Sequence, residues 1–230
     1  MAGPSIVASG ARLVDKIDMT DARSPLERVA PCVVLDAFLP AVEHRALLDW
    51  TFEHEAMFRP STVATGAVVT EIRSSRAVPR NTRGPWRDAI SSRVRTILPD
   101  LVARLGLAHF DVGRLELDLV SHNDGDHYRR HIDLVTQSDY SQRTRTISAI
   151  YYYHAEPLGF SGGALRLYPF SNRRDDDVFA DIEPVQNRLV AFPSWAPHEV
   201  LPIRCPSQRF SASRFSINCW IHRALPGEPQ

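Results

Sequence analysis

The stretch Arg214-Phe215-Ser216-Ile217-Asn218-Cys219-Trp220-Ile221 alternates between two kinds of side chain. Every second residue from Phe215 to Ile221 is apolar, and the residues between them begin with an arginine. Because successive side chains of a strand point to opposite faces, the pattern predicts a β-strand with one face in the core. The other face carries Arg214, which is unusual for a surface that merely meets solvent.

Extended segments of this kind dominate the second half of the chain. Leu115, Leu117 and Leu119 alternate with charged residues from Arg114 onward. Further strands are predicted at 146–153, 164–168, 188–192 and 198–203, with turn-rich pieces at 161–163 and 175–177.

Helical periodicity is confined to the first half, after a short predicted strand at 33–35. One predicted helix opens at Pro40, with these residues roughly on one face: Val42, Ala46, Leu47, Trp50 and Met57. A second runs from Ile90 to Leu105, and Pro99 inside it predicts a kink or two abutting helices. Helices followed by strands predict an α+β, mainly β chain: a β-sandwich or jelly roll with the helices packed on one sheet.

The composition is that of an ordinary globular protein. The 230 residues are 43% hydrophobic and 23% charged, which excludes disordered and fibrous classes, and the formal net charge is zero, so neither nucleic acid nor a membrane is an expected partner. We expect residues 1–30 to be a tail or edge segment and 31–230 to be one domain. Three widely spaced cysteines, and the lack of a signal peptide or long apolar run, predict a cytoplasmic protein.

A metal site is suggested by His131 and Asp133, which would project to the same side of an extended chain. His198 follows a later strand and can complete the set in a double-sheet fold, although it can also be a surface turn residue. Two imidazoles and one carboxylate on one face of an octahedral ion leave positions open, which suits non-haem Fe(II) oxygenases. Zinc more often takes a tetrahedral set.

A rival pair is His127 with His131, which have the four-residue spacing of helical zinc sites. The sequence Asn123-Asp124-Gly125-Asp126 before them disfavours a helix, and no glutamate follows His127. We interpret His122, His127 and His154 as loop or strand-edge residues.

Arg214 is suited to a dicarboxylate cosubstrate, because a guanidinium binds a carboxylate through two parallel hydrogen bonds. Divalent iron, ionised Asp133, a 2-oxoglutarate dianion and Arg214 together carry no net charge, which avoids an unpaired buried charge. Tyr152 can donate its hydroxyl to the same ligand or can be a core tyrosine.

The chain from about Leu115 to Trp220 resembles the prolyl 4-hydroxylase-like branch of the Fe(II)/2-oxoglutarate dioxygenases, including the hypoxia-factor prolyl hydroxylases and their bacterial relatives. The resemblance covers roughly half of the chain. It is carried by the segments at 128–133, 150–152, 161–166, 181–184, 197–200 and 214–220.

This resemblance implies a double-stranded β-helix and roles for particular residues. It implies iron bound by His131, Asp133 and His198, and 2-oxoglutarate bound by Arg214 and Tyr152. Arg145 and Trp220 become candidate substrate contacts. The spacing after His198 departs from the family and leaves Arg209 as a competitor of Arg214. Relatives often carry a tyrosine near Ser121 and His122, where this chain has none.

The predicted activity is therefore hydroxylation of an unactivated C–H bond with Fe(II), 2-oxoglutarate, O2 and, as a reductant, ascorbate. The resemblance favours a prolyl residue of a protein or peptide as substrate. The segments 73–83 and 134–144 can equally form a lid over a free amino acid or another small metabolite. A non-enzymatic cupin-like binder and a hydrolytic zinc enzyme are the other hypotheses.

Overall fold

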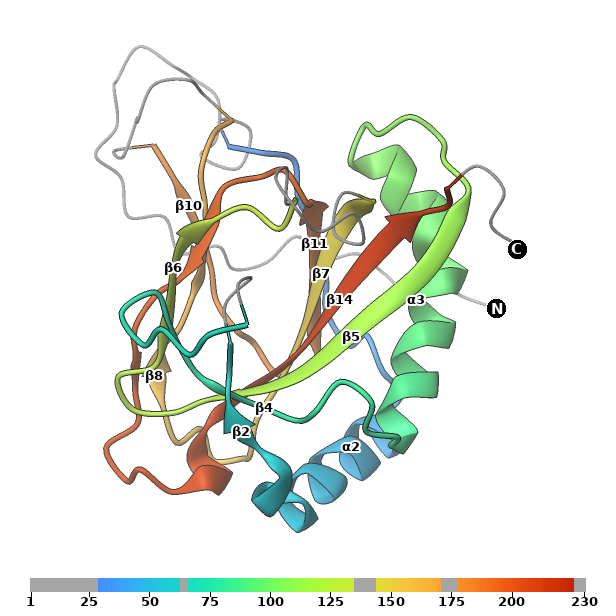
Figure 1. The fold of residues 1–230 in the computed structure, drawn as a ribbon. Helices are drawn as coiled ribbons and strands as arrows, with labels where there is room; N and C mark the ends of the chain where they lie inside the picture. The colour runs from blue at the N-terminus through green and yellow to red at the C-terminus, as the bar shows by residue number, and fades with distance from the viewer. Residues whose placement is uncertain (1–28, 63–65, 135–143, 171–177, 226–230) are drawn as a thin grey trace.

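The described part of the chain forms two large antiparallel sheets, a small two-stranded sheet of β13 and β8, and two α-helices (Figure 1). The computed structural model describes residues 29–62, 66–134, 144–170 and 178–225. The helices are α2 (Ala41–Glu53) and α3 (Pro85–Arg104), with short 3-10 turns η1 (Glu55–Met57) and η2 (Phe210–Ala212). The strands are β1 (Val33–Leu35), β2 (Arg59–Pro60), β3 (Arg73–Ser74), β4 (Arg76–Ala77), β5 (Val112–His122), β6 (His127–His131), β7 (Arg145–Tyr153), β8 (Ser161–Gly162), β9 (Leu165–Leu167), β10 (Ala180–Ile182), β11 (Arg188–Pro193), β12 (His198–Val200), β13 (Ile203–Arg204) and β14 (Arg214–Arg223).

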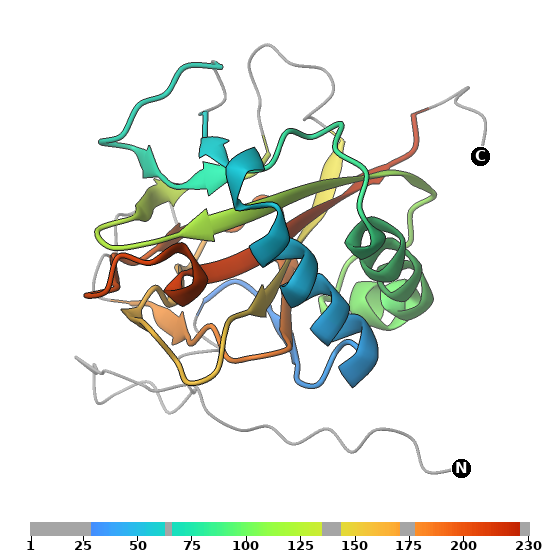
Figure 2. The same ribbon diagram turned by 90° about the horizontal axis from the view of Figure 1, so that it is seen from below.

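The larger sheet has the strand order β1-β11-β7-β14-β5-β4-β2, so β14 lies near its centre. β14 pairs with β5 on one side and β7 on the other, and Phe215, Ile217 and Ile221 on one of its faces are fully buried. That face belongs to the main core, which α2 and α3 cover from outside (Figure 2). The alternation that predicted this strand is confirmed, and the fold is mainly β with its helices on the larger sheet, as predicted.

The smaller sheet has the order β10-β9-β12-β6-β3 and faces the larger sheet on the side away from the helices (Figure 1). β12 and β6 are neighbours in it, and His198 lies opposite His131 in their register. The chain segments that carry these two histidines are thus brought together by strand pairing alone.

Three consecutive tyrosines in β7 show how the larger sheet separates two environments. Tyr151 and Tyr153 point to the helices, where the Tyr151 hydroxyl lies 2.7 Å from His44 Nδ1 and the Tyr153 hydroxyl 2.9 Å from Thr51 Oγ1. Tyr152 belongs to the second apolar cluster, between the sheets, and its buried hydroxyl has no hydrogen-bond partner within the described residues. A buried hydroxyl without a partner is costly, which marks Tyr152 as a residue that awaits a ligand.

The helices differ in two details from the sequence prediction. α3 is one helix that passes through Pro99, so of the two predicted alternatives the pair of abutting helices is wrong, and the kink stays a prediction. Pro99 is exposed, where the carbonyl that loses its donor can meet water. In α2 the buried residues include Leu47 and Leu48, whereas Val42, which the periodicity placed with Leu47, is exposed.

The strand boundaries follow the prediction with local changes. The predicted strand at 198–203 is two strands, β12 and β13, and the irregular segment 73–83 contains β3 and β4. His127 lies in a strand, which rules out the helical spacing required by the rival pair of histidines.

None of the described helices is both long and apolar enough to cross a lipid bilayer. Residues 1–28 of the predicted tail at 1–30, most of the 134–144 loop and the turn at 175–177 lie outside the described residues, and the one-domain prediction stays a prediction.

A charged cluster joins β5, β7 and β14, which are neighbours in the larger sheet. Glu116 of β5 accepts hydrogen bonds from Arg145 Nη2 at 2.8 Å and lies 3.1 Å from His222 Nε2. Arg80 contacts both Glu116 and Asp118. Burial would raise the pKa of Glu116, but the hydrogen bond with His222 and the charges of Arg145 and Arg80 outweigh it and lower the pKa to about 2.

We expect Ile90→Ala in α3 to lower the free energy of unfolding by about 2–4 kcal/mol, because Ile90 is fully buried in the main core. Val42→Ala, the control on exposed α2 surface, should change it by less than about 0.5 kcal/mol. Urea unfolding measures both. Equal effects would contradict the packing of α3 against the sheet.

Glu116→Gln should reduce the free energy of unfolding at pH 7 by roughly 3 kcal/mol. The folded pKa of Glu116 lies below the unfolded value of 4.5, so its contribution is complete above pH 4.5 and is lost as the pH falls toward 2. The difference between wild type and variant should therefore shrink between pH 5 and 3 in denaturant titrations. Glu43→Gln, on an exposed pair, should show little difference throughout.

Candidate functional site

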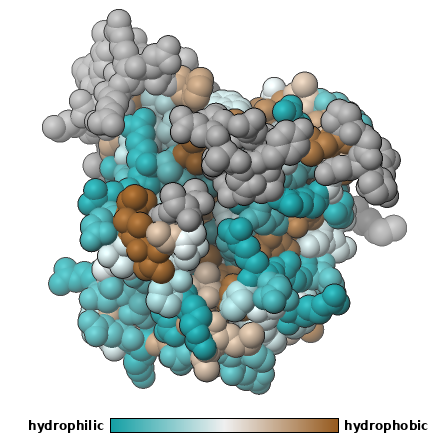
Figure 3. Space-filling model, viewed as in Figure 1, coloured by the Kyte–Doolittle hydropathy of each residue, from teal (hydrophilic) through white to brown (hydrophobic). Residues whose placement is uncertain are grey.

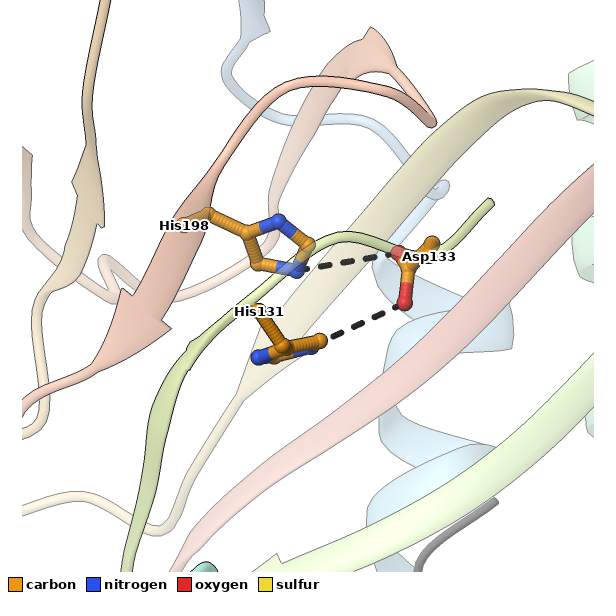
Figure 4. Close-up of side chains that lie close together, drawn as sticks. All are labelled: His131, Asp133 and His198. Atoms are coloured by element: carbon orange, nitrogen blue, oxygen red, sulfur yellow. Dashed lines mark ion pairs between the residues drawn. The ribbon is translucent and has the colours of Figure 1, made fainter. Parts of the chain in front are cut away.

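His131, Asp133 and His198 converge in the space between the two sheets (Figure 4). Asp133 Oδ1 lies 3.7 Å from His131 Nε2, and Asp133 Oδ2 lies 3.6 Å from His198 Nε2. His131 ends β6, His198 begins β12, and Asp133 follows β6 with its amide donating to the carbonyl of Ser194. Three side chains that are distant in the sequence thus offer one ligand atom each, all within 4.8 Å of one another.

Both imidazoles are held by the same kind of hydrogen bond. His131 Nδ1 lies 2.8 Å from the carbonyl of Arg129, and His198 Nδ1 lies 2.9 Å from the carbonyl of Ala196. Because a carbonyl only accepts, each Nδ1 carries the proton and each Nε2 presents its lone pair to the cluster. Burial and the neighbouring His131 lower the pKa of His198 to about 4, so this ring is neutral at physiological pH.

Asp133 is buried and ionised. Burial favours its neutral form, but His198, His131 and a 2.6 Å hydrogen bond from Ser148 Oγ together hold its pKa well below the usual range. Ser148 Oγ also lies 3.0 Å from Ser194 Oγ. The carboxylate is therefore fixed in the protonation state that a metal requires.

These donors fit a divalent transition metal. Ligand atoms about 2.1 Å from one ion and at right angles to each other lie about 3 Å apart, a little closer than the distances here. Two imidazole nitrogens and one carboxylate oxygen on one side of the ion are the donor set of non-haem Fe(II) oxygenases. His131, Asp133 and His198 would together hold one such ion beside the cavity.

A cavity of about 280 Å3 contains this cluster and continues to Arg214 at the start of β14. Arg214 is 1% exposed, its guanidinium lies over the ring of Tyr152 at 4.7 Å, and its Nη1 donates to His122 Nδ1 at 3.2 Å. Its Nε and Nη2 have no partner in the described part of the chain, and neither has the Tyr152 hydroxyl. A buried cation with unused donors beside an unused hydroxyl is suited to a carboxylate.

His122 is the third member of this pocket. Since Arg214 Nη1 donates to its Nδ1, the imidazole proton sits on Nε2, which is buried and unpartnered among the residues described. Burial, together with the charge of Arg214, lowers the pKa of His122 well below its usual value. His122 thus offers one neutral N–H donor where relatives were expected to carry a tyrosine.

Gly163 makes room for the arginine. Its φ of 71° is in the left-handed region, and a Cβ there would come within 2.8 Å of Arg214 Cδ. This is a physical reason for the Ser161-Gly162-Gly163 sequence beside the pocket.

Arg145 and Trp220 also line the cavity, stacked with the guanidinium 4.1 Å from the ring centre. The guanidinium is engaged by Glu116 and donates to the carbonyl of Asp133 at 3.3 Å. Arg209, the competitor of Arg214, is exposed and is not a cavity residue. His127 and His154 do not join the three-residue cluster.

Sequence reasoning missed Ser148 as a partner of Asp133 and His122 as a partner of Arg214. Ser148 lies two and four residues before Ile150 and Tyr152, so the alternation of β7 placed it on the cavity face. His122 lies opposite Arg214 in the β5–β14 register, which no local pattern reveals.

The surface on the side shown in Figure 3 is largely hydrophilic, with a compact hydrophobic patch near the segment that leads into β3. Val68 and Ile72 of that segment are exposed. Thr62 and Gly66, nearby in the chain, line the cavity.

Comparisons with known proteins agree with this geometry. Residues 117–222 match the model of the 2OG-Fe(II) oxygenase superfamily. An uncharacterized PKHD-type hydroxylase of Synechocystis sp. is 38% identical over 140 residues, which are 59% of this chain and 45% of that protein. The match therefore spans less than half of the relative's length.

Two solved structures share the fold. One is a prolyl hydroxylase of Trichoplax adhaerens, in complex with a hypoxia inducible factor peptide fragment, with a TM-score of 0.64, 22% identity and 86% of each chain covered. The other is a prolyl-4-hydroxylase of Pseudomonas putida, with a TM-score of 0.60, 24% identity and coverage of 87% of this chain and 96% of that one. These likenesses confirm the predicted jelly-roll fold. The segment 117–222, which carries the three clustered ligands and Arg214, is thus similar to the 2OG-Fe(II) oxygenase superfamily, and the chain shares its fold with prolyl hydroxylases.

Proposed function

We propose that the protein is an Fe(II)- and 2-oxoglutarate-dependent dioxygenase that hydroxylates an unactivated C–H bond. One observation carries the proposal: His131, Asp133 and His198 share a cavity with a buried, unsatisfied Arg214. A metal site alone would fit a hydrolase or a cupin-like binder as well. The additional pocket for a carboxylate is what a dicarboxylate cosubstrate requires.

His131, Asp133 and His198 hold the iron, and the hydrogen bonds from both Nδ1 atoms and from Ser148 keep them oriented. When bound, Fe(II) supplies the activation of O2, coupled to oxidation of 2-oxoglutarate to succinate and CO2. Arg214, Tyr152 and His122 bind the far carboxylate of the cosubstrate with charge-assisted and neutral hydrogen bonds.

The charges in the pocket support this assignment. The Arg214 cation is buried beside a neutral His122 and a neutral Tyr152 and pairs with no carboxylate among the described residues, and burial lowers its pKa. A dianionic cosubstrate, divalent iron and ionised Asp133 bring the site to neutrality. Asp133 thus offsets part of the charge of the iron, and Arg214 offsets the charge of the cosubstrate's far carboxylate.

A prolyl residue of a protein or peptide is the proposed substrate, supported by the likeness to two prolyl hydroxylase structures. A free amino acid or other small metabolite is the second candidate, and the small cavity favours one residue-sized group. Arg145 and Trp220 form the wall beside it. Ascorbate as a reductant and a cytoplasmic location belong to the same proposal.

A screen of peptides and free amino acids tests the function. With Fe(II), 2-oxoglutarate and ascorbate, we expect succinate release and, on the correct substrate, a mass gain of one oxygen. A protein that binds zinc stoichiometrically and never turns over 2-oxoglutarate would instead be a hydrolase or a binder.

His131→Ala and His198→Ala should each weaken Fe(II) binding by roughly 100-fold, because each removes one of three protein ligands. Anaerobic Fe(II) titration measures this directly. His127→Ala is the matched control, since His127 lies outside the cluster, and it should bind iron as wild type does. Loss of binding in His127→Ala and His131→Ala, with His198→Ala unaffected, would contradict the three-residue site and favour the rival pair.

Arg214→Gln should raise the KM for 2-oxoglutarate by roughly 10- to 100-fold, and Tyr152→Phe and His122→Ala by about tenfold each, because each removes a buried donor. Succinate formation at varied cosubstrate gives these values. The control Arg209→Gln should be unchanged because that residue is exposed. A silent Arg214→Gln with an impaired Arg209→Gln would transfer the role to Arg209.

A further inference from the structure

Arg73 is a second buried arginine in the cavity, and nothing above accounts for its charge. It lies on β3, opposite Tyr128 of β6, and is 8% exposed. Its Nε donates to Ser75 Oγ at 3.1 Å and its Nη1 donates to the carbonyl of Thr62 at 3.4 Å, which is a long contact. Both acceptors are neutral, and Asp118 and Asp133 act on the Arg73 charge from a distance without forming an ion pair with it among the described residues.

The other arginines of the cavity have anionic partners or an assigned ligand. Arg80 pairs with Glu116 and Asp118, and Arg145 pairs with Glu116. Arg214 is assigned to the cosubstrate. Once iron, cosubstrate and Asp133 are counted with Arg214, Arg73 remains as one uncompensated positive charge, which is costly in a buried position.

Arg73 is also close to the reaction centre. Its guanidinium lies 5.0 Å from the ring centre of Tyr128, and that ring stacks on His131 with 3.6 Å between centres. One aromatic ring therefore separates Arg73 from a metal ligand. A group bound to Arg73 lies within the same cavity as the ligand cluster.

Within the described residues, the Nη2 end of Arg73 makes no hydrogen bond and is available to a ligand. A guanidinium has five N–H groups in a planar fork, and the two hydrogen bonds to Ser75 and Thr62 leave the Nη2 end unused. Such a fork matches the two oxygens of a carboxylate.

We propose that the prime substrate presents a carboxylate to Arg73 while its C–H bond faces the metal. This inference rests on the proposed function and narrows its substrate to a carboxylic acid. The carboxylate can be the α-carboxylate of a free amino acid or the C-terminal carboxylate of a peptide, and both present the same two oxygens.

Matched pairs of probes that differ by one charge test the proposal. The first set compares each free amino acid with its carboxamide, beginning with L-proline and L-prolinamide. The second set compares peptides that end in proline, each as the free acid and as the C-terminal amide. We measure hydroxylated product, kcat/KM and binding by anaerobic calorimetry. The wild-type enzyme should prefer at least one acid over its amide by roughly 10- to 100-fold. The arm in which this preference appears identifies the source of the carboxylate.

Arg73→Gln should lose most of that preference by weakening the acid alone, and Arg73→Lys should retain part of it. The KM for 2-oxoglutarate should stay within about twofold in both variants. Arg76→Gln is the matched control: Arg76 lies on the adjacent β4, donates to the carbonyl of Phe58 and is not a cavity residue beside the metal ligands. It should keep the wild-type preference, and thermal unfolding checks that each variant is folded.

Three results would overturn the proposal: no acid preferred over its amide by the wild type, equal losses for acid and amide in both Arg73 variants, or a raised KM for 2-oxoglutarate in Arg73→Gln. The last would assign Arg73 to the cosubstrate. A failure of the proposed function is distinguishable, since the wild type would then form no succinate from 2-oxoglutarate with any probe.

Discussion

The strict two-residue period of β14, held between β5 and β7, is the constraint on which the rest depends. Its apolar face closes the core under the helices, and its other face begins with Arg214 and ends at Trp220 beside Arg145. A shift of one residue would bury Arg214 beneath α2 and α3 and turn Phe215 into the cavity. Pairing along both edges prevents this shift, so one register fixes both the core and the anionic-ligand pocket.

The cavity brings together several charges that a protein interior tolerates only when they balance. Asp133 is held by two imidazoles and Ser148, and Glu116 by Arg145, Arg80 and His222. Arg214 and Arg73 are cations that form no ion pair with a carboxylate among the described residues. This difference distinguishes structural groups from ligand-binding groups. Buried charged groups whose hydrogen bonds are all made stabilise the fold, whereas buried donors without acceptors favour a ligand that supplies them.

Much of this was predictable from the residues, and the limits have physical reasons. The alternation at 214–221 determined a strand and its buried face because a period of two leaves no other arrangement of those side chains. Convergence of the ligands required knowing that β12 pairs with β6, which is a long-range register. The same is true of His122 and of Arg73, whose importance comes from cross-strand neighbours. The continuity of α3 through Pro99 depends on the exposure of Pro99 to solvent. A weakly amphipathic sequence does not determine which side of a helix is exposed.

The two iron-ligand candidates from β6 and β12 share one further property. Each imidazole is tied to the carbonyl of the residue two positions before it, so both rings are clamped by their own strand segments. The rotational freedom of these side chains is lost when the chain folds, not when an ion arrives. The two imidazole rings are therefore ordered before metal binding. An ion that binds from solvent does not have to bear the entropy cost of fixing these side chains.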